Sequence, residues 1–137
     1  HNTLVLATVS EGFPASAPLF YASRGFDLYF LSDPSTRHGQ NLQANPSLAA
    51  TITEDYAKWQ DIRGIQLEGT AQLVIKPLEK AAGMAVYLGK FPFVSDFLKS
   101  ADFRNGAAKA ELYRIIPRVI WYIDNSQGFS HREKLVL

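Results

Sequence analysis

Residues 28–52 read LYFLSDPSTRHGQNLQANPSLAATI, and this stretch decides the fold. An apolar strand leads into a short polar turn, then one short helix, then a second strand. The turn places Ser32, Ser35, Thr36, Arg37 and His38 close together where the helix begins. The N-terminus of a helix presents free backbone N–H groups and a partial positive charge, which suit an anion. Hydroxyls and a guanidinium at that position favour a site for a phosphorylated ligand.

The same turn also has a simpler interpretation, as an ordinary helix cap beside a solvated arginine and histidine. Ser, Thr and Asp cap many helices, so capping alone would explain the hydroxyls. We expect a helix over roughly residues 36–44, which the following Asn-Pro pair ends because the residue before proline avoids the helical conformation. Asp33 could cap this helix with Pro34 at its first position, or Ser35 could cap it one turn later.

The totals indicate a small globular protein rather than a nucleic-acid binder. The chain has 137 residues, so we expect one domain over residues 1–137. At 47% hydrophobic and 20% charged residues, it can bury a proper core. The formal net charge of +1 gives no basic footprint in bulk and favours a small-molecule or protein partner. The lack of cysteine excludes disulfides and thiolate metal sites.

Neither end of the chain predicts a membrane or secretory destination. No apolar run reaches the length of a membrane span. The first residues, HNTLVLATVS, have no basic lead or cleavage pattern. We therefore expect a soluble cytoplasmic protein. The histidines at positions 1, 38 and 131 are too scattered in the sequence to indicate a metal site.

The spacing of apolar residues predicts a small antiparallel barrel with helices at its side. The connections are too short for parallel crossovers. The clearest alternation puts Ile65, Leu67, Ala71, Leu73 and Ile75 on one buried face. We predict helices over 77–88 and 93–98, a loop over 102–106, and strands over 4–9, 15–22, 27–31, 48–53, 65–75, 111–124 and 130–137.

Two further segments offer weaker candidates for a binding site. Arg63 precedes the alternating strand and could supply a second basic contact, and Gly64 could mark a bulge or a close backbone approach. Residues 121–131, WYIDNSQGFSH, combine aromatic rings with hydrogen-bonding side chains that could flank a planar ring system. These aromatics could equally be core or dimer surface, and Trp59 is better explained as packing at a barrel mouth.

The chain lacks the usual signatures of self-sufficient catalysis. It has no GxSxG, GxGxxG, Walker or HExxH sequence, and no carboxylate pair stands out for acid–base work. If the protein does chemistry, a bound cofactor is therefore the expected reactive element.

The run from Leu28 to Ile52, followed by IRGIQLEGTAQLV, resembles the pyridoxamine 5′-phosphate oxidase-like proteins, the FMN-binding split-barrel superfamily. The likeness covers residues 4–75 and, more loosely, 112–137. It implies a mainly β fold, a six-stranded antiparallel Greek-key split β-barrel with flanking helices. It also implies a homodimer with FMN bound at the subunit interface. Within that group, the sequence is more similar to small, poorly characterised flavoproteins and to general stress proteins than to the oxidases that act on pyridoxine phosphate.

The resemblance also assigns cofactor-binding positions. It implies that Thr36, Arg37 and His38 match the family's Ser-Arg-Lys phosphate contacts, with histidine replacing lysine. The family's Arg-Leu-His-x-Arg near the C-terminus is replaced here by residues 128–132, GFSHR, so recognition of vitamin B6 phosphate is not expected. Trp121 or Tyr122 lies near the position of the partner subunit's tryptophan. The full set of implied FMN contacts is Ser16, Ala17, Pro18, Leu19, Tyr21, Leu31, Ser32, Thr36, Arg37, His38, Gly64, Gln66 and Trp121.

From the sequence we predict an FMN-dependent oxidoreductase with an unknown substrate, for which no catalytic residue can be named. A non-catalytic flavin carrier or sensor on the same fold is the first alternative. Haem or a deazaflavin, which relatives of the fold bind, is the second, with His131 as a candidate iron ligand. A structural dimer without a ligand is the third.

Overall fold

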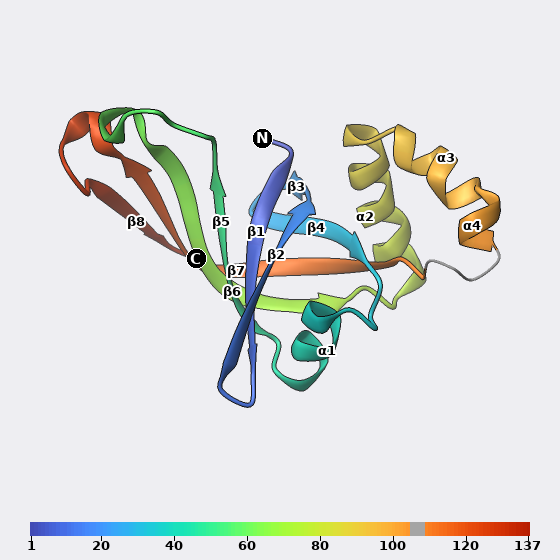
Figure 1. Cartoon of the computed structure of the whole chain (residues 1–137). Helices are drawn as coiled ribbons and strands as arrows, with labels where there is room; N and C mark the ends of the chain where they lie inside the picture. Colours follow the sequence, from blue (N-terminus) through green and yellow to red (C-terminus); the bar gives the residue numbers. More distant parts are fainter. Residues whose placement is uncertain (105–108) are drawn as a thin grey trace.

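The computed structural model describes residues 1–104 and 109–137, in which strands outnumber helices. The strands are β1 (Thr3–Ser10), β2 (Phe13–Phe20), β3 (Ala22–Arg24), β4 (Asp27–Ser32), β5 (Ser47–Thr53), β6 (Arg63–Leu73), β7 (Glu111–Asp124) and β8 (Arg132–Val136). The helices are α1 (Arg37–Ala44), α2 (Pro77–Lys90), α3 (Phe93–Lys99) and α4 (Ala101–Arg104), and short 3-10 turns occupy Trp59–Asp61 (η1) and Asn125–Gln127 (η2). Figure 1 shows α2, α3 and α4 gathered at one side of the curled sheet and the β7–β8 hairpin at the other.

The strands form one antiparallel sheet in the order β2-β1-β5-β6-β7-β4-β3, and β8 joins it by pairing with β7. The predicted antiparallel split-barrel class is thereby confirmed. The expected count of six strands is wrong, because the described residues form eight. One of the additional strands, β3, arises because the chain breaks at Tyr21, whose N–H donates to the carbonyl of Asn2 at 3.0 Å. Another, β8, pairs along the second half of β7.

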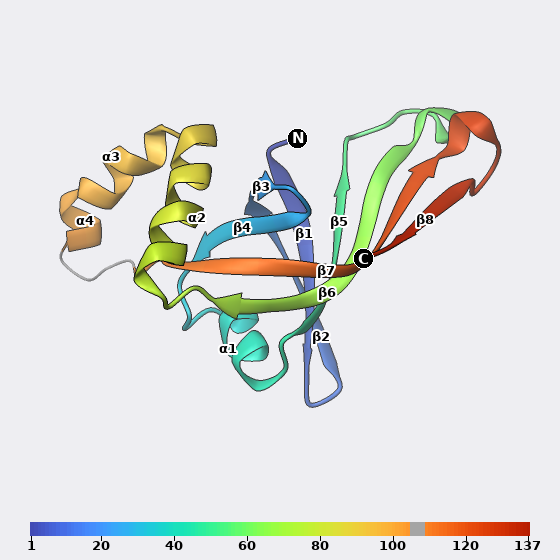
Figure 2. The same ribbon diagram turned by 180° about the vertical axis from the view of Figure 1, so that it is seen from behind.

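The long strand β7 is shared by three neighbours, as Figure 2 shows from behind. Residues 111–115 pair with β4, residues 119–123 pair with β8, and β6 runs along the opposite side. Pro117 falls between these two segments, where a residue without an N–H interrupts the sheet least. The β6–β7 register shifts at the facing Gly69, where a side chain would collide with the carbonyl of Ile116.

Both faces of the sheet are covered along β4 and along residues 112–115 of β7. One face lies inside the curl of the sheet, where the rings of Phe30 and Tyr113 stack at 4.8 Å between centroids. The other is covered by α2 and α3, whose buried residues include Tyr87 and Val94. Gly83 of α2 lets the helix approach closely, because a Cβ there would lie 2.7 Å from Leu112 and 2.9 Å from Tyr29. The two hydrophobic clusters therefore fix the helices to the sheet on which the site is built.

The structure corrects the sequence-based predictions at the ends of several elements. The segment predicted as one strand over 15–22 is divided between β2 and β3. Leu73 and Ile75, predicted to be buried, are 41% and 80% exposed, because the alternation ends with β6 and Val74 turns inward to the α2 cluster. Part of the predicted loop at 102–106 is helical in α4, and its last two residues lie outside the described residues. No helix in the described part of the chain is long and apolar enough to cross a membrane.

Candidate functional site

The first turn of α1 is organised by the side chain of Thr36. Its hydroxyl accepts the N–H of Gly39 at 3.2 Å and donates to the carbonyl of Asp33 at 2.7 Å. Thr36 is thus the N-cap, in place of the Asp33 or Ser35 expected from the sequence. The carboxylate of Asp33 instead accepts the N–H of Ser35 at 2.8 Å, which forms the tight turn before the cap.

His38 lies within hydrogen-bonding distance of two hydroxyl groups. Its Nε2 lies 2.6 Å from Oγ of Ser32, at the end of β4, and 3.2 Å from Oγ1 of Thr36. Burial lowers the pKa of His38, so the imidazole is largely neutral at neutral pH. The structure therefore brings together Ser32, Thr36 and His38, as the sequence predicted, but they are hydrogen-bonded to one another.

The charge of Arg37 is not paired with any described residue. Its side chain is exposed and makes no hydrogen bond or ion pair with any described residue. The backbone N–H groups of Arg37 and His38, the first two residues of α1, also donate to no described carbonyl. An exposed guanidinium and two unpaired backbone N–H groups at the start of a helix form a set that fits a phosphate group.

The predicted ring-binding residues of β2 lie on an edge strand that pairs only with β1. Such an edge tolerates Pro18 and leaves backbone groups free for a ligand. Ser16 and Pro18 are exposed, whereas Ala17 and Leu19 are half-buried. Helix α1 contacts both β1 and β2, and Asn41 of α1 donates to Oγ1 of Thr8 at 3.0 Å in the buried interface with β1.

Two other predicted contacts belong to the packed interior. Tyr21 is 8% exposed, and burial raises the pKa of its phenol. Nζ of Lys90 lies 4.2 Å from the centre of the Tyr21 ring and donates to the Tyr21 carbonyl at 2.8 Å. Leu31 of β4 packs against the cluster under α2.

A second group of predicted residues lies on β6 and β7, away from α1. Gln66 and Trp121 are opposite each other in the β6–β7 register and line a cavity of about 320 Å³. Arg132 lines the same cavity, a contact that sequence reasoning missed. The sequence could not reveal this contact, because it depends on the pairing of β8 with β7. Gly64 is a close backbone approach, because a Cβ there would lie only 2.8 Å from the carbonyl oxygen of Ile52 and would clash with it.

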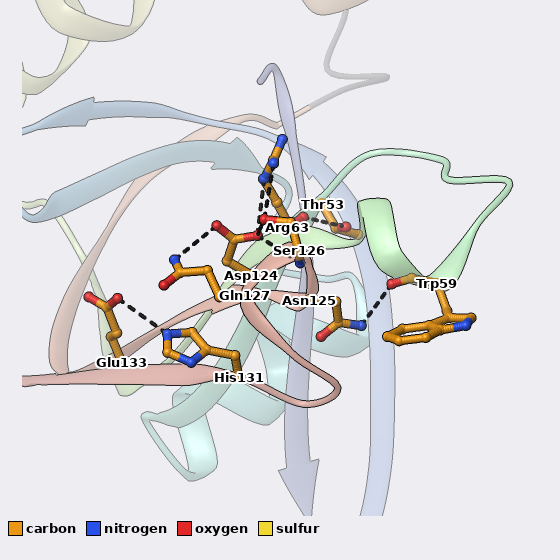
Figure 3. Close-up of polar contacts among 9 residues, drawn as sticks. All are labelled: Thr53, Trp59, Arg63, Asp124, Asn125, Ser126, Gln127, His131 and Glu133. Carbon is orange, nitrogen blue, oxygen red and sulfur yellow. Dashed lines mark hydrogen bonds and ion pairs between the residues drawn. The ribbon is translucent and has the colours of Figure 1, made fainter.

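Arg63, a candidate for a second basic contact, is committed to an ion pair. Figure 3 shows its guanidinium directed at Asp124, which it meets at 3.2 Å through Nε. The Asp124 carboxylate also accepts the N–H and hydroxyl of Ser126 and the amide of Gln127, at 2.6 to 3.1 Å. These bonds, led by those from Ser126 and Gln127, hold the pKa of Asp124 well below its usual range. The cluster therefore fastens the ends of β6 and β7.

Two exposed aromatic side chains, Trp59 and Phe129, lie at the same end of the molecule. The rings of Trp59 and Phe129 meet edge to face at 5.5 Å, and both are largely exposed. Asn125 ties the two loops together, because its Nδ2 donates to the carbonyl of Trp59 at 2.9 Å (Figure 3). His131, the candidate iron ligand, lies on the outside with Nε2 at 3.4 Å from Oε1 of Glu133.

Comparisons with known proteins place this geometry in a family. Residues 1–125 match the family model for pyridoxamine 5′-phosphate oxidase. A UPF0306 protein of Photorhabdus laumondii is 26% identical over 95% of this chain and 82% of its own length.

Two solved structures share the fold. A heme-binding protein from Mycobacterium smegmatis superposes with a TM-score of 0.77 at 19% identity, over 98% of this chain. This chain spans 52% of the length of that protein. A FAD-binding protein from Mesorhizobium loti gives a TM-score of 0.71 at 17% identity, over 98% of this chain and 86% of the other. Given the match over residues 1–125, the chain belongs to the pyridoxamine 5′-phosphate oxidase family.

Proposed function

We propose that this protein binds FMN and holds its phosphate at the start of α1. The observation that carries the proposal is a group of unpaired hydrogen-bond donors there. They are the Arg37 guanidinium and the backbone N–H groups of Arg37 and His38. The hydroxyls of Ser32 and Thr36 lie beside these donors. A phosphate would accept the Ser32 hydroxyl proton in place of His38 Nε2, while the Thr36 hydroxyl keeps its bond to the carbonyl of Asp33. The phosphate would also favour the protonated imidazole.

We propose that the flavin ring lies along the free edge of β2, between Ser16 and Leu19. That edge offers unpaired backbone donors and acceptors to the polar side of the ring. The Gln66–Trp121 pair belongs to a different part of the same chain, on β6 and β7. A second copy would therefore supply these side chains to the first copy's cofactor, and the functional unit is a homodimer.

The outward face of β5, β6 and β7 supports this pairing of two copies. A cavity of about 760 Å³ lies there, and its walls include Ala7, Ala49, Ile116 and Leu137. On the same face, Ile116 of β7 is 37% exposed and Val5 of β1 is 46% exposed. An exposed face of small and apolar side chains is typical of a surface that another protein covers.

When bound, the flavin would supply the electron-accepting chemistry that the side chains lack. The residues of this chain would bind the phosphate, orient the ring and exclude water from one of its faces. The activity that fits this arrangement is an oxidoreductase whose substrate and electron donor are not encoded in any motif. A flavin carrier is the alternative, and anaerobic mixing of the loaded protein with NADH and NADPH separates the two. Bleaching of the flavin absorbance supports the enzyme, and an unchanged spectrum with both donors supports the carrier.

The phosphate site is tested by comparing FMN with riboflavin, which lacks the phosphate. Arg37→Ala removes a charge-assisted contact worth roughly 1.5–3 kcal/mol, so FMN affinity should fall roughly 10- to 150-fold. Riboflavin affinity should not change. Fluorescence titration of both ligands measures this, and Arg24→Ala, an exposed arginine on β3, is the matched control. Equal losses for both ligands, or no loss for FMN, would refute the phosphate assignment.

Haem is the second candidate, because a structural neighbour is named as a heme-binding protein. The visible spectrum of the purified protein distinguishes haem from flavin, because haem gives one intense Soret band and flavin gives two weaker bands. Loss of a Soret band in His131→Ala would assign that histidine to the iron. A flavin spectrum would exclude this candidate.

A further inference from the structure

A row of side chains crosses four strands on the outward face of the sheet. In the strand register, Thr51 of β5 is opposite Gln66 of β6, Gln66 is opposite Trp121 of β7, and Trp121 is opposite Lys134 of β8. Cross-strand partners project to the same side of a sheet, so these four side chains are neighbours. Three of them, Thr51, Gln66 and Trp121, line the cavity of about 320 Å³ together with Arg132.

The charged residues of β8 are divided between the two faces of the strand. Arg132 and Lys134 are two residues apart, so both project to the side on which Trp121 lies. Glu133, between them, projects to the opposite side, where its Oε1 lies 3.4 Å from Nε2 of His131 (Figure 3). The side of β8 that faces the cavity is therefore cationic.

These two cations have no carboxylate partner in the part of the chain that the structure describes. The side chain of Arg132 makes no hydrogen bond or ion pair there. The ammonium of Lys134 makes only a cation–π contact, 5.7 Å from the centre of the Trp121 ring. The carboxylate in the cavity lining, that of Glu68, is already paired with Arg118 at 3.2 Å. The cavity thus combines two unpaired positive charges with an indole ring.

This combination selects an anion that is attached to a flat ring. The planar guanidinium of arginine matches a carboxylate or a phosphate group, and a lysine adds a second positive charge. The indole offers a flat apolar surface against which a ring can pack. We propose that the cavity binds a small aromatic anion, with its carboxylate or phosphate group held by Arg132 and Lys134 and its ring against Trp121.

The inference rests on the proposed function and deepens it, because Gln66 and Trp121 are the side chains that a second copy would bring to the flavin. The substrate of the oxidoreductase is then an aromatic acid bound beside the ring. The hydroxyl of Thr51 and the amide of Gln66 make no hydrogen bond with any described residue, so they can serve its other polar atoms. The phosphate of FMN has its own site at Arg37, on a different element from Arg132.

Four probe compounds separate the contributions of the charge and of the ring. Benzoate and phenyl phosphate have both, benzamide lacks the charge, and acetate lacks the ring. The chain has two tryptophans, so Trp59→Phe identifies the indole N–H signal of Trp121 in ¹⁵N-labelled protein. Benzoate or phenyl phosphate should shift that signal, and the tighter of the two identifies the acidic group. Benzamide and acetate should bind at least roughly 10-fold more weakly, the lower limit for a hydrogen bond to a charged group.

Two variants assign the anion to its cations. Arg132→Gln and Lys134→Gln should each weaken benzoate and phenyl phosphate binding roughly 10-fold and leave benzamide binding unchanged. Arg24→Gln removes the same charge from an exposed position on β3 and is the matched control. Melting temperatures confirm that all three variants fold. Equal affinity of both anions for wild type and Arg132→Gln, or an equal loss in Arg24→Gln, would overturn the proposal.

Titration with FMN and riboflavin keeps this result separate from that of the cofactor site. Arg132→Gln should leave the ratio of the two affinities at its wild-type value. Loss of that ratio would make the FMN phosphate the anion at Arg132 and would overturn the proposal. Benzoate binding by a protein that takes up no FMN would refute the proposed function and leave the anion site standing.

The position of the cavity beside the flavin is tested with the FMN-loaded protein. Benzoate should shift the visible flavin bands at the concentrations that shift the Trp121 indole signal, and benzamide should not. An unchanged flavin spectrum at saturating benzoate would overturn the assignment of this anion as the substrate.

Discussion

Asp124 is the residue with the densest set of polar contacts in the described chain. Its carboxylate accepts four hydrogen bonds, from Arg63, from two groups of Ser126 and from Gln127. We predict that Asp124→Asn lowers the melting temperature at pH 7 by several degrees, because the amide cannot accept all of these bonds. Asp61→Asn, at an exposed position in η1, is the matched control and should melt like the wild type.

The same carboxylate predicts a pH dependence with a definite sign. The folded-state pKa of Asp124 lies below the unfolded value of about 3.9. Its stabilising effect is therefore fully present above that unfolded value and is lost as the pH falls through the folded one. Melting curves from pH 6 down to pH 2 should show a difference between wild type and Asp124→Asn that is constant above about pH 5 and narrows steadily below about pH 4, where the unfolded state begins to bind the proton. A constant difference across that range would show that the charge is not responsible.

At the scale of elements, two glycines of α2 make opposite predictions. Gly83→Ala should destabilise the protein by roughly 1–3 kcal/mol, because the new methyl overlaps Leu112 and Tyr29. Gly89→Ala, near the end of the same helix, meets nothing within 4 Å and should stabilise it by up to about 1 kcal/mol. Urea unfolding measures both. Similar changes in the two variants would mean that α2 does not pack on β4 and β7 as described.

Helices and strands could be predicted from the sequence wherever residues close together in the chain set the pattern. The strand predicted over 111–124 has the bounds of β7, and apolar spacing predicted α2 and α3 closely. What failed depended on partners distant in sequence. The burial of Val74 in place of Ile75 is decided by α2 and by its backbone bond to the carbonyl of Leu112 at 2.9 Å, which no local pattern contains.

The candidate site shows the same division. The cluster of Ser32, Thr36 and His38 was visible because all three fall within one turn of chain. The choice of Thr36 as cap was not, because Asp33, Ser35 and Thr36 all have suitable side chains and only the final backbone geometry selects one. The commitment of Arg63 to Asp124 joins residues 61 positions apart and required the β6–β7 register.

At the scale of the whole molecule, the proposed dimer can be tested at Ala49. This exposed residue of β5 lines both cavities on the outward face of the sheet. We predict that Ala49→Glu places a charge in the interface and halves the mass measured by light scattering after gel filtration. FMN binding should weaken in parallel. Ala81→Glu, on an exposed position of α2, is the control and should leave the dimer intact.

A wild-type protein that elutes as a monomer would refute the dimer itself. A dimeric Ala49→Glu variant would refute only the choice of face. The two results are separable because the first concerns the assembly and the second concerns which strands form it.

Strand β8 closes the sheet with an edge that has no further neighbour, and every one of its five residues is exposed. Its first three residues are Arg132, Glu133 and Lys134, and only then do Leu135 and Val136 follow. Charges at such an edge discourage strands of other molecules from adding to it and growing into aggregates. The short charged run thus opposes the addition of a foreign strand at the β8 edge, beside the long strand β7.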